Sequence, residues 1–96
     1  MVHFEWDEQK NQRNLDKHRI DFETAQLMFD DPLCVTFIER IEAGEARWHG
    51  IGSVEGLVLL AVVHTYREAE PDHFIRIISA RRATRHERKL YEAAHS

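Results

Sequence analysis

The sequence predicts a single α+β domain over residues 1–96, built on a mainly antiparallel sheet. Three observations predict this class: helical patterning in the first third of the chain, four strand-like segments separated by short turns, and a helix signal near the C-terminus. The predicted order of elements is β-α-α-β-β-β-β-α. We expect the two early helices to cover one face of the sheet, which leaves the opposite face for function.

The first three predicted elements are a short strand and two helices. Residues 3–6 alternate polar and apolar side chains, which is typical of a strand. Asp7 can cap a helix over residues 8–18, and this helix has so few large apolar residues that its cations must face water or a partner. A second helix begins at Asp21 and ends before Pro32, because the residue before a proline is pushed out of the helical region. Its buried stripe is predicted to contain Phe22, Ala25 and Phe29, widened by Leu27 and Met28.

Four strands and a final helix follow. The segments rich in β-branched and aromatic residues are 34–41, 46–52, 57–66 and 74–80. The third of these strands is apolar on both faces as far as Val63, so it should lie centrally in the sheet. The polar segment 67–73 contains Pro71 and is predicted to be a loop. Thr84 and Glu87 have the spacing of a capping box, which predicts a helix to about residue 94.

Composition excludes several classes of protein. The chain is 43% hydrophobic and 31% charged, values typical of a folded soluble protein, and its longest apolar run, 57–63, is too short to span a bilayer. The first residues lack the regions of a signal peptide, and a single cysteine, Cys34, cannot form an internal disulfide. We therefore expect a cytoplasmic protein that contacts no membrane. The seven histidines show no metal-ligand spacing, so we expect no metal and no cofactor.

The charge of the chain is unevenly distributed. The segment 74–90 has six basic residues and one acid, a net +5; since the whole chain carries −4, the remainder carries −9. All but one of the six bases are arginine, which suits bidentate phosphate contact. A solvated basic helix face is the alternative interpretation. The distribution favours a polyanion as partner, and RNA is the polyanion we expect.

Two predicted strands bring candidate catalytic residues together. A simple antiparallel register centred on residue 70 pairs His64 with Arg76. The neighbouring guanidinium should lower the pKa of His64 and favour a neutral imidazole base at pH 7. The alternative is a histidine with a structural role in the core or at an edge.

Further cations extend the candidate site. Lys17 and His18 end the first helix. In one interpretation Lys17 stabilises charge and His18 is a second acid–base candidate, and in the other both are cations that favour the helix C-terminus. Arg81 and Arg82 lie just before a helix N-terminus, whose free amides also favour an anion. We expect Tyr91 to pack against the sheet with its hydroxyl free to reach the site. The predicted phosphate- or RNA-binding residues are Arg81, Arg82, Arg85, Arg47 and Tyr91.

Several motifs, in order and at matching spacing, resemble those of BrnT toxins over nearly the whole chain. They are Phe4-Glu5-Trp6-Asp7, Asn14-Leu15, Lys17-His18, Phe22-Glu23 with Ala25, Phe29-Asp30-Asp31-Pro32, Val63-His64-Thr65, Arg76-Ile77-Ile78-Ser79-Ala80-Arg81-Arg82-Ala83-Thr84, Glu87-Arg88 and Tyr91. The resemblance implies a RelE-like fold and the toxin of a type II toxin–antitoxin system. One departure is Arg19, which stands where family members often have the glycine of Lys-His-Gly, so it either extends the first helix or adopts a less favourable turn.

The resemblance also implies an activity and partners. BrnT toxins are metal-independent endoribonucleases that stop translation and bacterial growth, so the expected substrate is messenger RNA, free or on the ribosome. The implied partner is a BrnA-like ribbon-helix-helix antitoxin, in a heterotetramer of two toxins and two antitoxins that contacts promoter DNA only through the antitoxin. The alternative is a non-catalytic nucleic-acid- or protein-binding module on the same fold, since the same arginines would bind phosphate in both.

Overall fold

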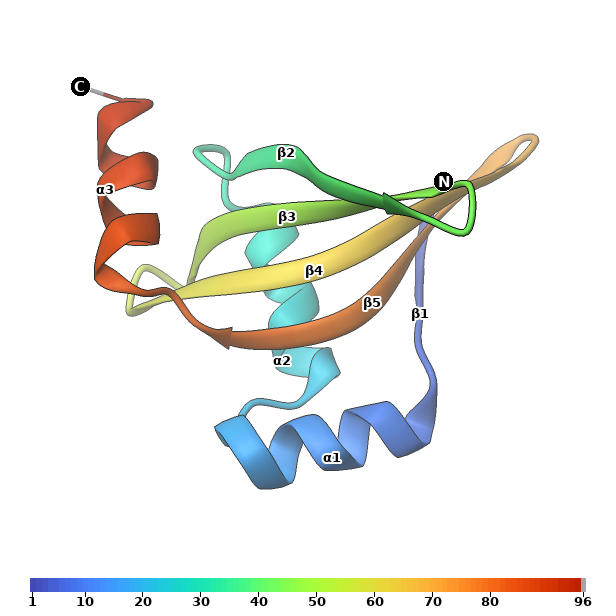
Figure 1. The fold of residues 1–96 in the computed structure, drawn as a ribbon, viewed down its shortest axis with the longest axis horizontal. Helices are drawn as coiled ribbons and strands as arrows, with labels where there is room; N and C mark the ends of the chain where they lie inside the picture. The colour runs from blue at the N-terminus through green and yellow to red at the C-terminus, as the bar shows by residue number, and fades with distance from the viewer. Residues whose placement is uncertain (96) are drawn as a thin grey trace.

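The computed structural model describes residues 1–95 and has the predicted α+β architecture (Figure 1). In chain order the elements are β1 (Val2–Glu5), α1 (Glu8–His18), α2 (Phe22–Ala25), the 3-10 helix η1 (Gln26–Asp30), β2 (Val35–Glu42), β3 (Glu45–Val54), β4 (Val58–Ala69), β5 (Asp72–Arg82) and α3 (Arg85–Ala93). None of the described helices is both long and apolar enough to span a bilayer.

The strands form one five-stranded sheet in the order β1-β5-β4-β3-β2. The last four strands pair antiparallel, as predicted, and β1 pairs parallel with β5. The predicted central position of the apolar strand is confirmed, because β4 lies third of five. The predicted loop 67–73 is wrong: β4 runs to Ala69 and β5 begins at Asp72, so only residues 70 and 71 turn the chain. Backbone pairing at an exposed hairpin end does not depend on apolar side chains. The polar residues of this segment therefore gave no strand pattern, although the segment is paired.

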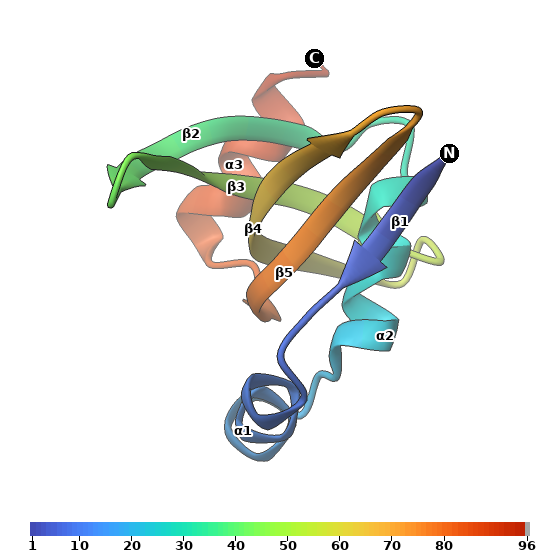
Figure 2. The same ribbon diagram turned by 90° about the vertical axis from the view of Figure 1, so that its right-hand side faces the viewer.

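One face of the sheet, the helix face, is covered by α2 and η1 (Figure 2). Their buried side chains are Phe22, Ala25 and Met28, which pack against Val54, Leu60, Val62 and Ile77. Phe22 and Ala25 belong to α2, and the tighter 3-10 turn of η1 places Met28, three residues further on, on the same side. Met28, predicted only to widen the stripe, is fully buried, whereas Phe29, predicted at its centre, is partly buried. Gly52 permits this packing, since a Cβ there would lie 2.7 Å from Met28 Cγ.

Helix α1 lies at the free edge of β5 rather than on the helix face, so the prediction that both early helices cover one face is wrong for α1. A buried polar side chain of α1, Asn14, holds the helix there. Asn14 is buried, and its Nδ2 donates hydrogen bonds to the carbonyl oxygens of Ala80 at 2.7 Å and Ile20 at 2.9 Å, while its Oδ1 accepts one from the Ala80 N–H at 3.1 Å. The amide thus satisfies the edge of β5 as a neighbouring strand would. Arg19 ends α1 in the left-handed conformation, with φ of 61°, which is the place a glycine fills at lower cost.

The opposite face of the sheet, the open face, is covered only at one end, by α3 (Figure 2). Strand alternation places on this face Phe37 and Glu39 of β2, Arg47 and His49 of β3, Val63, Thr65 and Arg67 of β4, and Arg76, Ser79 and Arg81 of β5. The predicted projection of Arg76 away from Ile75 and Ile77 is confirmed: both isoleucines are buried, and Arg76 is exposed.

Candidate functional site

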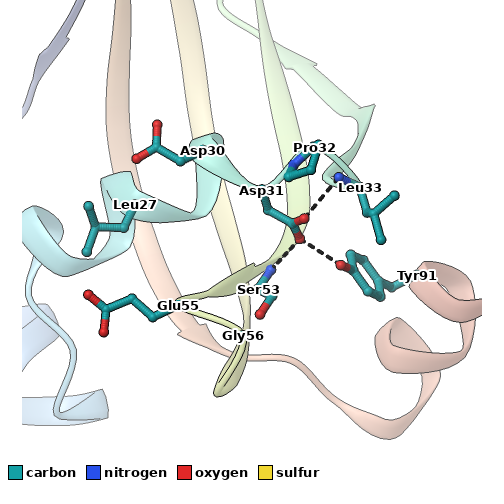
Figure 3. A pocket seen from close by; sticks show the side chains of 9 residues that line it. All are labelled: Leu27, Asp30, Asp31, Pro32, Leu33, Ser53, Glu55, Gly56 and Tyr91. Atoms are coloured by element: carbon teal, nitrogen blue, oxygen red, sulfur yellow. Dashed lines mark hydrogen bonds between the residues drawn. The ribbon is translucent and has the colours of Figure 1, made fainter.

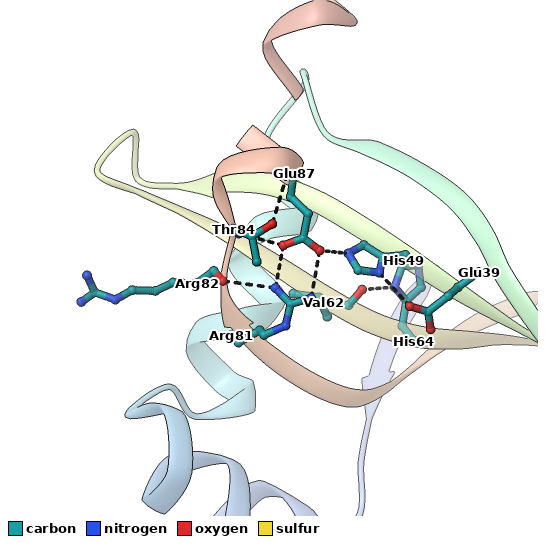
Figure 4. Close-up of polar contacts among 8 residues, drawn as sticks. All are labelled: Glu39, His49, Val62, His64, Arg81, Arg82, Thr84 and Glu87. Carbon is teal, nitrogen blue, oxygen red and sulfur yellow. Dashed lines mark hydrogen bonds and ion pairs between the residues drawn. The ribbon is translucent and has the colours of Figure 1, made fainter. Parts of the chain in front are cut away.

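Four ionisable side chains from four elements meet on the open face beneath the start of α3 (Figure 4). They are Glu39 of β2, His49 of β3, Arg81 of β5 and Glu87 of α3, and we call them the His49 cluster. The Arg81 Nη1 and Nη2 groups donate hydrogen bonds to Oε1 and Oε2 of Glu87 at 2.6 Å and 2.9 Å. This two-point contact of a guanidinium with a carboxylate is the strong form of the interaction.

The imidazole of His49 lies between two carboxylates. Its Nε2 is 2.7 Å from Oε2 of Glu87, although the two atoms lack the alignment of a hydrogen bond, and its Nδ1 is 3.3 Å from Oε1 of Glu39. The ring of Phe37 stacks on the imidazole at 5.1 Å and 9°. His49 is 5% exposed and Phe37 38% exposed, so access to the imidazole depends on the more exposed side chains around it.

The helix cap of α3 positions the carboxylate of the cluster. Thr84 and Glu87 form the predicted capping box: the Thr84 N–H donates to Oε1 of Glu87 at 2.8 Å, and the Glu87 N–H donates to Oγ1 of Thr84 at 3.2 Å. The carboxylate that caps the helix therefore also binds Arg81 and approaches His49. The start of α3 is in this way fixed to the two strands that carry the cations.

The electrostatics of the cluster keep its ion pair charged at neutral pH. Hydrogen bonds from Arg81 lower the pKa of Glu87 to about 2, despite burial that opposes the shift, and the bond from Thr84 adds to the effect. The same contact raises the pKa of Arg81. The side chain of Glu87 is 9% exposed and that of Arg81 is 39% exposed. The guanidinium is thus held in place by a buried carboxylate while remaining open to a ligand.

His64 does not lie at this site, and its predicted pairing with Arg76 is wrong. The turn at residues 70 and 71 sets Thr65 opposite Arg76 and His64 opposite Ile77. A register change of one residue moves a side chain to the other face of a sheet. His64 is accordingly 0% exposed on the helix face, packed edge-on against Phe29 at 4.8 Å.

The predicted depression of the His64 pKa has a different cause from the one expected. Burial, rather than a neighbouring guanidinium, lowers the pKa to about 4. Its Nδ1 donates to the Val62 carbonyl at 3.1 Å, and its Nε2 lies 3.1 Å from the Tyr66 hydroxyl. Both ring nitrogens are therefore engaged within the protein, and the core role left open for this histidine is the one the structure supports.

Tyr91 is also tied to another part of the molecule (Figure 3). Its hydroxyl donates a hydrogen bond to Oδ2 of Asp31 at 2.7 Å, which raises the pKa of Tyr91 to about 12. The same carboxylate accepts bonds from the N–H groups of Leu33 and Ser53 and joins η1, β3 and α3 beside a pocket of about 550 Å³. The expectation of a free hydroxyl that reaches the site is therefore wrong.

The remaining predicted cations lie in several places. Arg47 is half-buried on the open face, with Nε 3.3 Å from Oε2 of Glu42. Arg76 is exposed on the same face, beside Glu5 and Arg67. The other predicted phosphate ligands, Arg82 and Arg85, are exposed near the start of α3, and the Arg82 side chain extends away from the cluster (Figure 4).

Lys17 and His18 line a groove of about 310 Å³ between α1 and β5, together with Lys10, Arg13, Asn14, Ile78 and Ser79. We call it the α1 groove. Of all the predicted site residues, only Arg81 belongs to the His49 cluster. Lys17 and His18 are neighbours of each other but not of the predicted catalytic partners His64 and Arg76.

Sequence reasoning missed three members of the cluster: His49, Glu39 and Glu87. The alternation of Arg47, His49 and Ile51 along one strand was available as a signal that His49 shares a face with Arg47. Glu87 was recognised only as a helix cap, and its second role depends on the placement of α3 over the sheet. Within residues 1–95, no group of three or more His, Cys, Asp or Glu side chains is arranged to hold a metal ion.

Comparison with known proteins gives two matches of the same kind. A family profile described as "Ribonuclease toxin, BrnT, of type II toxin-antitoxin system" matches residues 6–87. The chain is also similar to the Brucella abortus ribonuclease toxin BrnT, whose crystal structure was solved at 1.1 Å resolution: the identity is 29%, the TM-score is 0.64, and the match covers 88% of this chain and 99% of the Brucella chain. Comparison with curated protein sequences finds no match.

Proposed function

Since the chain belongs to the BrnT family of ribonuclease toxins of type II toxin–antitoxin systems, we propose that it cleaves RNA internally and without a metal ion. In the proposed reaction the ribose 2′-hydroxyl loses its proton and attacks the adjacent phosphorus, and the bond to the 5′-oxygen breaks. One product ends in a 2′,3′-cyclic phosphate, and the other gains a proton on its 5′-oxygen. The reaction requires a group that moves protons and a cation that stabilises the pentavalent phosphorus.

The observation that carries the proposal is the His49 cluster on the open face. Within residues 1–95, Arg81 uses three of its five N–H groups, two on Glu87 and one on the Arg82 carbonyl. Its Nε–H and the second N–H of Nη2 remain, and both point to the same side of the planar group. This edge suits bidentate contact with a phosphate.

His49 is the proposed proton carrier of the reaction. With a pKa of about 2, Glu87 is too weak a base to take up a proton at neutral pH. Its role is therefore to orient the imidazole and Arg81. Glu39 covers Nδ1 of His49 but is 39% exposed on the edge strand β2. Displacement of Glu39 by RNA would open Nδ1 to the 2′-hydroxyl.

Other cations are proposed to bind the RNA backbone rather than to act on the scissile bond. Arg76 and Arg47 lie on the same face as the cluster, and Arg82 and Arg85 are exposed at the start of α3. We assign no chemical role to His64 or Tyr91, because their polar atoms are engaged elsewhere.

The proposed biological role follows from the family. The toxin would act in the cytoplasm on messenger RNA, inhibit translation and arrest growth until a BrnA-like ribbon-helix-helix antitoxin binds it. A complex of two toxins and two antitoxins would contact promoter DNA through the antitoxin alone. Growth arrest on expression of the toxin, relief by a co-expressed antitoxin, and the mass of the purified complex test these statements separately.

The test of the activity uses purified protein, EDTA and 5′-labelled single-stranded RNA. Fragments ending in a 2′,3′-cyclic phosphate are expected, and an oligonucleotide of the same sequence with 2′-deoxy sugars should stay intact. The same RNA in a translating bacterial extract shows whether the ribosome is needed. Intact RNA in both settings, with protein that is folded, would favour the non-catalytic binding module instead.

A further inference from the structure

The α1 groove concentrates positive charge in the part of the chain outside residues 74–90, which carries a net charge of −9. Lys10, Arg13 and Lys17 line it together with His18. At 100° per residue, positions 10, 13 and 17 lie within about 60° of one another around the helix. None of the three cations forms an ion pair with any residue in the described part of the chain. Arg13 Nε donates a hydrogen bond to the Gln9 carbonyl at 3.4 Å, and the Asp7 carboxylate is near enough to Lys10 and Arg13 to feel their charge. In a chain with a net charge of −4, three cations on one side of a helix without a direct ion pair are an uneven distribution that a polyanion would match.

The groove is built into the fold rather than formed by chance on a mobile surface. Asn14 lies between Arg13 and Lys17 in sequence. Its side-chain amide forms two hydrogen bonds with the backbone of Ala80, one to the carbonyl oxygen at 2.7 Å and one from the N–H at 3.1 Å. This clamp fixes the helix against the free edge of β5. The pairing of β5 with β4 also has a bulge, since Val63 faces Ser79 while His64 faces Ile77. The extra residue at the bulge, Ile78, lines the groove next to Ser79.

A straight row of side chains joins the groove to the His49 cluster. Ser79 pairs with Val63, Val63 pairs with His49, and His49 pairs with Phe37. Residues directly opposite one another in a sheet share a face, so this row crosses the open face from the groove to the edge strand. Ser79 and His49 are two strand spacings apart, roughly 10 Å. A single strand of RNA with one phosphate at Arg81 therefore has neighbouring phosphates within reach of the groove.

We propose that the α1 groove binds the backbone phosphates of single-stranded RNA beside the cleaved position, through Lys10, Arg13 and Lys17. The inference rests on the proposed function for the direction of the RNA across the open face, but the binding itself requires no cleavage. The row that joins the groove to the His49 cluster ends at Phe37, whose aromatic ring is 38% exposed. Proteins that hold single strands without sequence preference combine a positively charged groove with exposed aromatic side chains on which bases stack. Lys17 and His18 then belong to substrate binding rather than to the chemical step.

The test measures binding of a 2′-O-methyl single-stranded RNA, which cannot undergo 2′-hydroxyl attack, by fluorescence anisotropy. The test variant is Arg13→Gln with Lys17→Gln, and the matched control is Arg88→Gln with Lys89→Gln, two exposed cations of α3. Both double variants lose two positive charges, and glutamine is as good a helix former as lysine or arginine. Circular dichroism and unfolding in urea verify that each is folded.

We expect the groove variant to raise Kd about 10-fold or more, and to reduce the slope of log Kd against log salt by about 1.4, as for two lost phosphate contacts on a single strand. The control variant should change Kd by no more than about 3-fold, which is a nonspecific effect of net charge. Equal weakening in both variants, or no change in either, would overturn the proposal. So would a groove variant that binds RNA normally but no longer binds the antitoxin, because the groove would then serve a protein partner.

The assay separates this inference from the proposed activity. If the wild-type protein cuts no RNA but the groove variant still loses affinity for the 2′-O-methyl strand, the proposed activity fails and the groove assignment stands. If cleavage occurs and the groove variant binds like the wild type, the groove assignment fails alone. Where cleavage is measurable, the groove variant is expected to raise KM and leave kcat near the wild-type value.

Discussion

Replacement of Arg81 by methionine tests the ion pair that organises the His49 cluster. The side chain of Glu87 is 9% exposed, and in the variant it loses the guanidinium that contacts both of its oxygens. These contacts are the first cause of a pKa that falls from an ordinary 4.5 to about 2. At about 1.4 kcal/mol for each pH unit, the whole difference corresponds to roughly 3 kcal/mol of stabilisation. Because the side chain of Arg81 is 39% exposed, water weakens its attraction to Glu87, and the hydrogen bonds between Glu87 and Thr84 remain in the variant. We therefore expect the unfolding free energy to fall by about 1 to 2 kcal/mol.

The pH dependence of this loss follows from the direction of the shift. Because folding lowers the pKa of Glu87, the pair stabilises the native state fully above pH 4.5 and progressively less as the pH falls towards 2. The difference in unfolding free energy between wild type and Arg81→Met should therefore be largest at pH 7 and smaller at pH 3. Urea unfolding followed by the fluorescence of Trp6 and Trp48 measures it at both values.

Arg82→Met is the matched control for this experiment. Arg82 is the next residue of the same strand, it is exposed, and its guanidinium has no partner within residues 1–95. Its replacement should change the unfolding free energy by less than about 0.5 kcal/mol. Equal losses in the two variants, or a loss in Arg81→Met that does not vary with pH, would refute the view that a buried Arg81–Glu87 pair holds α3 to the sheet.

Three further substitutions separate structural from chemical roles, each followed by urea unfolding and by cleavage of labelled RNA. His64→Leu should leave the cleavage rate per folded molecule unchanged, because His64 is 0% exposed on the helix face; a large fall in that rate would return the chemistry to this residue. Tyr91→Phe should cost roughly 1 kcal/mol by removing the bond to Asp31, and a loss of cleavage without a loss of stability would contradict its structural role. Arg19→Gly should raise the unfolding free energy by about 0.5 kcal/mol, since relief of left-handed strain is partly offset by the entropy of glycine in the unfolded chain; a lower value would show that the Arg19 side chain contributes more than its backbone costs.

The sequence predicted the sheet well where apolar patterning decides the structure. The position of β4 followed from its apolar run, and the start of α3 followed from Thr84 and Glu87, because both signals are local. The register of the last hairpin did not follow. A turn of two residues at 70 and 71, in place of a loop centred on residue 70, is enough to move His64 to the other face.

The candidate site was harder to predict than the fold because it depends on contacts between distant elements. Arg81 was recognised by its charge and position. Glu87 acquires its second role only when α3 lies over β3 and β5, and the carboxylate partner of His49 on β2 is ten residues away in sequence. A buried histidine that takes part in catalysis can stand in the same local sequence pattern as one that only stabilises the core. The sequences around His49 and His64 therefore do not distinguish their roles. The face of the sheet on which each side chain lies does.

The central claim is that the chemistry takes place at His49 on the open face. The most direct measurement is the single-turnover cleavage rate of 5′-labelled RNA in EDTA by His49→Gln, corrected for the folded fraction, together with its affinity for the 2′-O-methyl strand. The account predicts a fall of about 10²-fold or more in the rate with little change in affinity, as expected when a general base is removed. Cleavage by folded His49→Gln at the wild-type rate would contradict it.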